Sequence, residues 1–201
     1  MGILTWLFGG DPAARAAKLE KRATAVKKEK PDEAMAALRQ AEALQKQAGA
    51  HLYTQLQTRL RMATVMYENG KFDDAERFLL LELETARRLQ LEKRADGPAD
   101  FDRNLYCKAI YTKLRTCYEL AKRFDKALVF AMAQVYAEYE NSLHIDLERQ
   151  PDFKPVLRCL KKLGREDDME RLQAVFGKYA RKPDSTKCWR MIDEIQENFT
   201  K

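Results

Sequence analysis

Glycine and proline are scarce in this chain. Its 201 residues include 8 glycines and 6 prolines, where average usage gives about 24 of the two together. Folds built from many short strands need frequent turns, and turns depend on these two residues. Their scarcity argues against a sandwich or barrel of strands and favours long helices.

Histidine is rare in this chain, and no two cysteines lie close together in the sequence. The histidines are His51 and His144, and the cysteines are Cys107, Cys117, Cys159 and Cys188. A zinc site needs ligands paired at short spacing, and no Gly-rich phosphate loop is present either. We therefore expect no metal, cofactor, small-molecule substrate or catalytic centre, and interpret the protein as not an enzyme. The cysteines are expected to be small core residues in a reducing compartment.

The excess of one charge is slight. The chain carries 37 basic and 31 acidic residues, which are interleaved and give a formal charge of +6. Such an excess favours acidic partners, but it is too weak and too dispersed to predict a nucleic-acid-binding surface.

An apolar segment, residues 1–10, opens the chain. It has no basic start and its apolar run is too short for a signal peptide or a membrane span, so we expect a cytoplasmic protein. Its large apolar residues are costly to leave in water. Two fates stay open: the segment folds back on the first helices, or it docks on a partner or at a membrane interface. The candidate docking residues are Ile3, Leu4, Trp6, Leu7 and Phe8.

Apolar residues recur at steps of three and four along the rest of the chain, which predicts about nine helices and no strand. Asp11-Pro12 is a helix start, Asn69-Gly70 a helix stop and residues 95–99 a turn. The predicted helices span residues 12–30, 31–48, 51–69, 72–94, 100–122, 124–148, 151–164, 166–179 and a final stretch after residue 184.

Four predicted helix–turn–helix corners align without gaps. They are Glu29–Ala34, Gly70–Ala75, Lys122–Ala127 and Gly164–Met169. In the second and third, a residue that stops one helix is followed by an aromatic residue, an aspartate suited to a helix start, and an alanine where two helices approach closely. An internal repeat of this kind indicates stacked helical hairpins.

These corners resemble tetratricopeptide repeats. The resemblance implies an all-α fold in which antiparallel helical hairpins stack as a right-handed solenoid, with about four pairs plus a C-terminal helix in one domain over residues 11–201. Corner alanines 34, 75 and 127 and Met169 are spaced by 41, 52 and 42 residues, against the family's period of 34. The helices are therefore longer than the family's.

The resemblance further implies a concave groove, lined by the first helix of each pair, that binds a partner protein or peptide. The chain would then act as an adaptor, scaffold or chaperone-like module with an acidic segment as ligand and with Leu120 and Tyr118 as apolar anchors. The groove residues implied are Arg61, Thr64, Lys113, Thr116, Leu120, Arg158, Lys161 and Lys162. Two alternatives stay open: a peripheral membrane adaptor anchored by residues 3–8, and a basic nucleic-acid-associated factor, which the weak charge excess disfavours.

Overall fold

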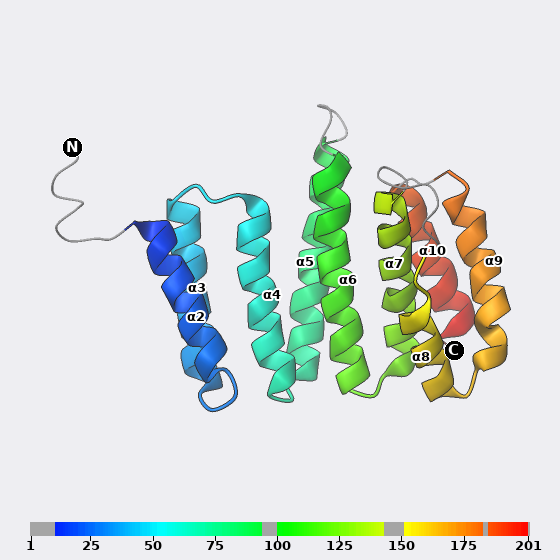
Figure 1. The fold of residues 1–201 in the computed structure, drawn as a ribbon, viewed down its shortest axis with the longest axis horizontal. Coiled ribbons are helices and arrows are strands. Elements are labelled where there is room, and N and C mark those ends of the chain that lie inside the picture. The colour runs from blue at the N-terminus through cyan, green and yellow to red at the C-terminus, as the bar shows by residue number, and fades with distance from the viewer. Residues whose placement is uncertain (1–10, 94–99, 143–150, 183–184, 201) are drawn as a thin grey trace. The chain divides into compact units, whose positions relative to one another are not determined.

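The computed structural model describes the backbone of residues 11–93, 100–142, 151–182 and 185–200. Within these ranges the chain forms nine α-helices and one 3-10 turn, with no strand, which confirms the all-α prediction (Figure 1). None of the described helices has the length and apolar character needed to cross a bilayer. The elements are α2 (Pro12–Val26), α3 (Pro31–Gln47), α4 (Leu52–Glu68), α5 (Phe72–Lys93), α6 (Asp100–Leu120), α7 (Phe124–Ser142), α8 (Lys154–Leu163), η1 (Glu166–Asp168), α9 (Met169–Ala180) and α10 (Ser185–Phe199).

The predicted helix ends agree with most of these bounds, with three differences among the described residues. Helix α8 begins at Lys154 instead of at residue 151. The predicted end of the sixth helix, near residue 148, lies outside the described residues. The first helix ends at Val26 instead of near Lys30, because the residue before a proline avoids the α conformation and Lys30 precedes Pro31. The helix predicted from Glu166 begins as a 3-10 turn and becomes an α-helix only at Met169. The apolar segment 1–10, the predicted turn 95–99 and His144 lie outside the described residues.

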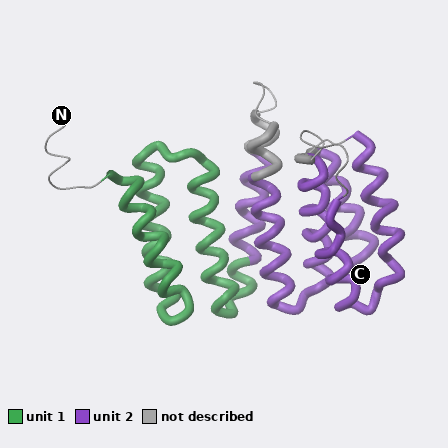
Figure 2. Tube along the Cα trace, in the orientation of Figure 1, with its two compact units in different colours: residues 1–75 green, residues 76–201 purple. Residues whose placement is uncertain are grey.

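Contacts divide the chain into two compact units, Met1–Ala75 and Glu76–Lys201 (Figure 2). In the first unit, α3 packs against both α2 and α4. Alanines let α2 and α3 approach closely: Ala16, Ala23 and Ala41 are almost completely buried. The prediction of one domain over residues 11–201 stays a prediction.

Helix α7 lies at the centre of the second unit. Helices α6, α8, α9 and α10 all pack against it, and residues 127–133 and 135–137 are all buried. A helix surrounded in this way has to be apolar on every side. The side chains that fill this core include Met132 and Tyr136 of α7 and Leu160 of α8.

The C-terminal helix α10 closes this core. Its stripe of Ile192, Ile195 and Phe199 is buried, as the sequence predicts. At its start, the Trp189 ring meets the Tyr111 ring edge-on, with centroids 6.0 Å apart. The Arg87 guanidinium lies 4.1 Å from the centre of the Trp189 ring. Helix α10 therefore joins residues from α5 and α6 as well as packing on α7.

Three of the four predicted corners share one backbone conformation. Gly70, Lys122 and Gly164 occupy the aligned position and have φ values of 77°, 58° and 66°, the left-handed conformation that ends helices. The first corner lacks it: Glu29 N–H donates to the carbonyl of Val26 and the chain turns without a left-handed residue. The aligned alanines Ala34, Ala75 and Ala127 are completely buried, as predicted for a close helix crossing.

Candidate partner-binding surface

The predicted groove residues are divided between the two units. Arg61 and Thr64 lie on α4 in the first unit, and the other six lie on α6 and α8 in the second. Of these six, Arg158 of α8 contacts α6, through Glu119. The candidate docking residues Ile3, Leu4, Trp6, Leu7 and Phe8 lie outside the described residues.

In the first unit, the predicted residues bind other parts of the same unit. The Arg61 guanidinium lies 3.3 Å from the Glu20 carboxylate of α2. Thr64 donates to the carbonyl of Leu60 and shares a hydrogen bond with Tyr67. These contacts assign Arg61 to holding α4 beside α2.

A buried polar network supports the same contact between α2 and α4. Thr58 of α4 is completely buried, and its hydroxyl contacts Glu20 of α2 and Gln45 of α3. The Gln45 amide donates to Glu20 at 3.1 Å. Buried polar groups need such partners to avoid a large desolvation cost, so the network fixes the register of three helices.

In the second unit, Glu119 connects α6 to α8. Its Oε1 accepts from Arg158 Nε at 3.2 Å and from Arg158 Nη2 at 3.1 Å. Arg115, one turn earlier on α6, lies 3.6 Å from the same oxygen. The Cys159 thiol also donates to it, at 3.8 Å. Arg158 is therefore already paired with a carboxylate of its own chain, which the sequence did not predict.

This ion pair defines which residues of α6 and α8 share a face. Helices α6 and α8 run in the same direction, since the turn from α6 into α7 and the C-terminal end of α8 lie on the same side of the unit (Figure 1). Leu120 follows Glu119 by one residue, and Leu157 precedes Arg158 by one. Each leucine therefore lies about 100° from the ion-paired residue of its own helix, in opposite senses on parallel helices. On this basis we assign both leucines to one face.

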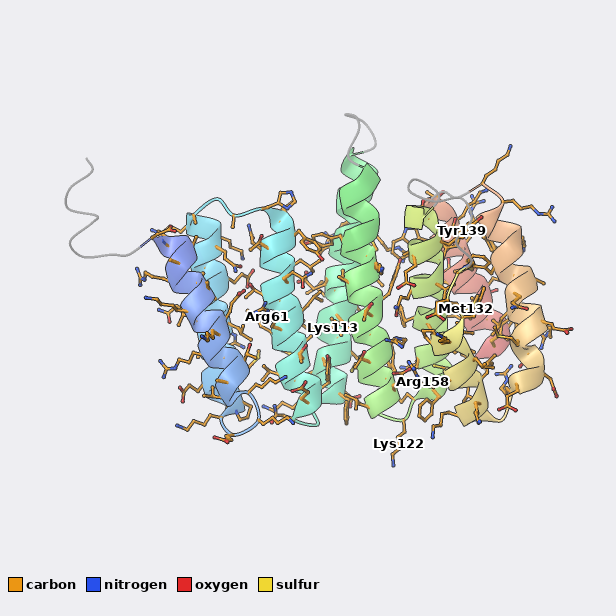
Figure 3. All side chains as sticks on the ribbon, viewed as in Figure 1. Arg61, Lys113, Lys122, Met132, Tyr139 and Arg158 are labelled. Carbon is orange, nitrogen blue, oxygen red and sulfur yellow. The ribbon has the colours of Figure 1, made fainter. Side chains whose placement is uncertain are left out.

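Steps of three and four residues extend this face along both helices. We call it the α6/α8 face, and it consists of Lys113, Thr116 and Leu120 of α6 with Lys154, Leu157 and Lys161 of α8. Figure 3 labels Lys113 on α6 and Arg158 on α8, at the edge of the face. The exposed face ends at buried residues on each helix, such as Leu114 and Leu160. Helical geometry thus assigns the predicted residues Lys113, Thr116, Leu120 and Lys161 to this face.

The two leucines of the α6/α8 face are half exposed: the exposed fraction is 51% for Leu120 and 46% for Leu157. Lys154 and Lys161 flank Leu157 on the same side of α8, and neither forms an ion pair with any described residue. Apolar residues framed by unpaired charges of one sign are suited to a partner that has both apolar and acidic groups.

Two residues of the predicted groove, Tyr118 and Lys162, are placed differently from the prediction. Tyr118 is buried, and its hydroxyl donates to Glu76 at 3.0 Å, so the prediction that it anchors a ligand is wrong. Lys162 lies one turn after Arg158, on the opposite flank from Lys161. Leu157 was missed because the sequence argument sought charge on α8. Its position outside the buried stripe of Val156, Cys159 and Leu160 could have revealed it.

The four cysteines all lie buried in helices, as predicted, and are not joined in disulfides. Burial raises the pKa of Cys107 and of Cys159 to about 12, with the Glu140 and Glu119 carboxylates, respectively, adding to the effect. The thiolate is the reactive form of cysteine, so these thiols are unreactive at neutral pH. Among the described residues, no group of His, Cys, Asp and Glu is arranged to hold a metal ion.

Comparison with known protein families, with curated proteins and with solved structures finds no match to this chain. The resemblance to tetratricopeptide repeats therefore rests on the sequence of the corners alone.

Proposed function

We propose that this protein is a non-enzymatic interaction module that binds a partner protein through the α6/α8 face. The observation that carries the proposal is the pair of half-exposed leucines, Leu120 and Leu157, beside the unpaired Lys154 and Lys161. Burying each leucine on a partner removes apolar surface from water, while the lysines select and orient an acidic partner.

The hairpin arrangement supports a tetratricopeptide-like role for this face. The first helices of successive pairs are joined by ion pairs in both units: Arg61 with Glu20, and Arg158 with Glu119. The repeated left-handed corners and buried corner alanines support the same repeat register. In the tetratricopeptide family, the first helix of each pair lines the binding groove, and in the repeat register that we propose α6 and α8 correspond to such first helices.

The ligand best suited to this face is an acidic protein segment that also carries apolar side chains. Two half-buried leucines expose too little apolar surface for membrane insertion, which uses a full stripe of large apolar residues. Nucleic acid would gain from the lysines but not from the leucines, because phosphate contacts supply most of its binding energy. A peptide with leucines on one helical face and glutamates on the other uses both features.

Binding of such a peptide tests the proposal. The probe is a fluorescein-labelled amphipathic peptide of leucine and glutamate, followed by fluorescence anisotropy. Two control peptides replace all glutamates by glutamine or all leucines by serine. We expect saturable binding of the probe, and weaker binding of both controls.

Charge reversal then locates the site. In Lys154→Glu/Lys161→Glu, binding of the probe should fall by about tenfold or more, because each lysine contributes on the order of 0.2–1 kcal/mol and each glutamate adds repulsion. The matched control Arg181→Glu/Lys182→Glu makes the same charge change at exposed positions after α9. Equal loss in both double variants would contradict the proposed site. Tighter binding to phosphatidylserine vesicles or to duplex DNA through the same lysines would contradict a protein ligand.

A further inference from the structure

The Glu119–Arg158 ion pair occupies the edge of the α6/α8 face where an acidic ligand would arrive. Arg158 is well exposed, with 51% of its side chain accessible, although both of its donor contacts go to Glu119. Glu119 is mostly buried between the two helices. A glutamate of the chain therefore holds the arginine that follows Leu157.

Glu119 has a second partner that a ligand does not displace. Arg115 lies 3.6 Å from Glu119, and only 13% of its side chain is accessible. Its Nε is buried and has no hydrogen-bond partner among the described residues. Arg115 therefore has a donor to spare, and Glu119 keeps a cation beside it when Arg158 turns away. This matters because an unpaired charge is strongly unfavourable in a buried position.

From these contacts we propose that Glu119 is a built-in competitor of the acidic ligand: it occupies Arg158 in the free protein and yields it to a ligand carboxylate. The inference rests on the proposed function of the α6/α8 face and adds a mechanism of selection. Glu119 holds the Nε/Nη2 edge of Arg158, so a ligand carboxylate that binds this edge with two parallel donors has to displace Glu119. A ligand without a carboxylate near Leu157 gains nothing from opening the pair.

Competition from Glu119 lowers the affinity of every acidic ligand for Arg158, and ligands then differ in how well they overcome it. Specificity is a difference between affinities, and internal competition lowers the affinity of segments whose carboxylate is misplaced. Removing the competitor should therefore strengthen binding, whereas removing an ordinary positioning residue weakens it. The opposite signs make the inference testable.

The test measures the Kd of the leucine–glutamate probe peptide for wild type, Glu119→Gln, Arg158→Gln and the double variant. Glutamine keeps the size of Glu119 and removes its charge. We expect Glu119→Gln to bind the probe roughly three- to tenfold more tightly, as expected for one freed charge-assisted contact. Because the effect acts through Arg158, Glu119→Gln should change nothing in the Arg158→Gln background.

Two controls complete the design. Glu194→Gln removes a carboxylate from α10, where it pairs with Lys178, and should leave the Kd unchanged. Glu119→Asp keeps the negative charge but shortens the side chain by one methylene, which moves the carboxylate away from Arg158. This variant should also strengthen binding of the probe, and it replaces Glu119→Gln in the test if Glu119→Gln does not fold.

The outcomes separate the inference from the proposed function. If Glu119→Gln binds the probe as wild type does or more weakly, Glu119 is not a competitor of the ligand. If wild-type binding still depends on Lys154 and Lys161 in that case, the proposed binding site on the α6/α8 face is unaffected. If the gain in probe affinity persists in the Arg158→Gln background, or if Glu194→Gln produces the same gain, the effect comes from net charge. Either result would also contradict the role of Glu119 as a competitor. Absence of probe binding in all of these proteins overturns both proposals.

Discussion

Single residues at the corners carry much of the information that defines this fold. Gly70 and Gly164 have the left-handed conformation that glycine adopts without cost. Lys122 has it too, with φ of 58°, although a side chain makes this conformation unfavourable. The alignment of Lys122 with two glycines could be made from sequence alone, and the structure confirms it.

Glycine should therefore be the better residue at the third corner. We expect Lys122→Gly to raise the free energy of unfolding by about 0.5–1 kcal/mol, the relief of left-handed strain outweighing the added flexibility of the unfolded chain. Gly70→Ala should lower it by about 1 kcal/mol for the converse reason. Urea unfolding measures both changes. A loss of stability in Lys122→Gly would mean that the Lys122 side chain contributes more than its backbone strain costs.

Among elements, the helices and their ends could be predicted, but the partners of α10 could not. Periodicity, caps and breakers are local signals, and they place the ends of α3, α4 and α5 within a residue or two. The packing of α10 against α7, with Trp189 reaching α5 and α6, depends on contacts between residues far apart in sequence. The tetratricopeptide pattern describes hairpins and gives no position for such a helix.

Thiol labelling tests the position of α10. Cys188 of α10 lies 3.8 Å from the Tyr111 hydroxyl, and the Cys107 thiol contacts the same tyrosine. Trp189→Ala removes a large ring from this contact, at a cost of roughly 3 kcal/mol. It should raise alkylation rates of Cys107 and Cys188 in the native protein by tenfold or more through local opening.

Cys159 of α8 is the internal control, because it is buried away from α10 and pairs with Glu119. Its alkylation rate should stay the same, as followed by mass spectrometry of the labelled peptides. Equal acceleration of Cys107, Cys159 and Cys188 would indicate global unfolding and would contradict a local role for Trp189.

At the scale of the whole molecule, only part of the candidate site could be predicted from the sequence. The family resemblance pointed to α6 and α8, and helical geometry assigns Lys113, Thr116, Leu120 and Lys161 to one face. The pairing of Arg158 with Glu119 was missed because nothing in the sequence shows that residues 39 positions apart meet. The burial of Tyr118 was missed because the family pattern does not predict its hydrogen bond to Glu76.

The central claim is that the leucines of the α6/α8 face anchor an acidic partner, and one measurement addresses it directly. Leu120→Ser/Leu157→Ser and the control Leu80→Ser/Leu81→Ser each remove two exposed leucines from the second unit, the control pair being on α5. The Kd of the leucine–glutamate probe is measured by fluorescence anisotropy for both double variants and wild type. We predict that the first variant loses binding by at least about thirtyfold, since each leucine contributes roughly 1 kcal/mol or more on burial, while the control binds like wild type. Wild-type affinity in Leu120→Ser/Leu157→Ser, or an equal loss in both variants, would contradict the account.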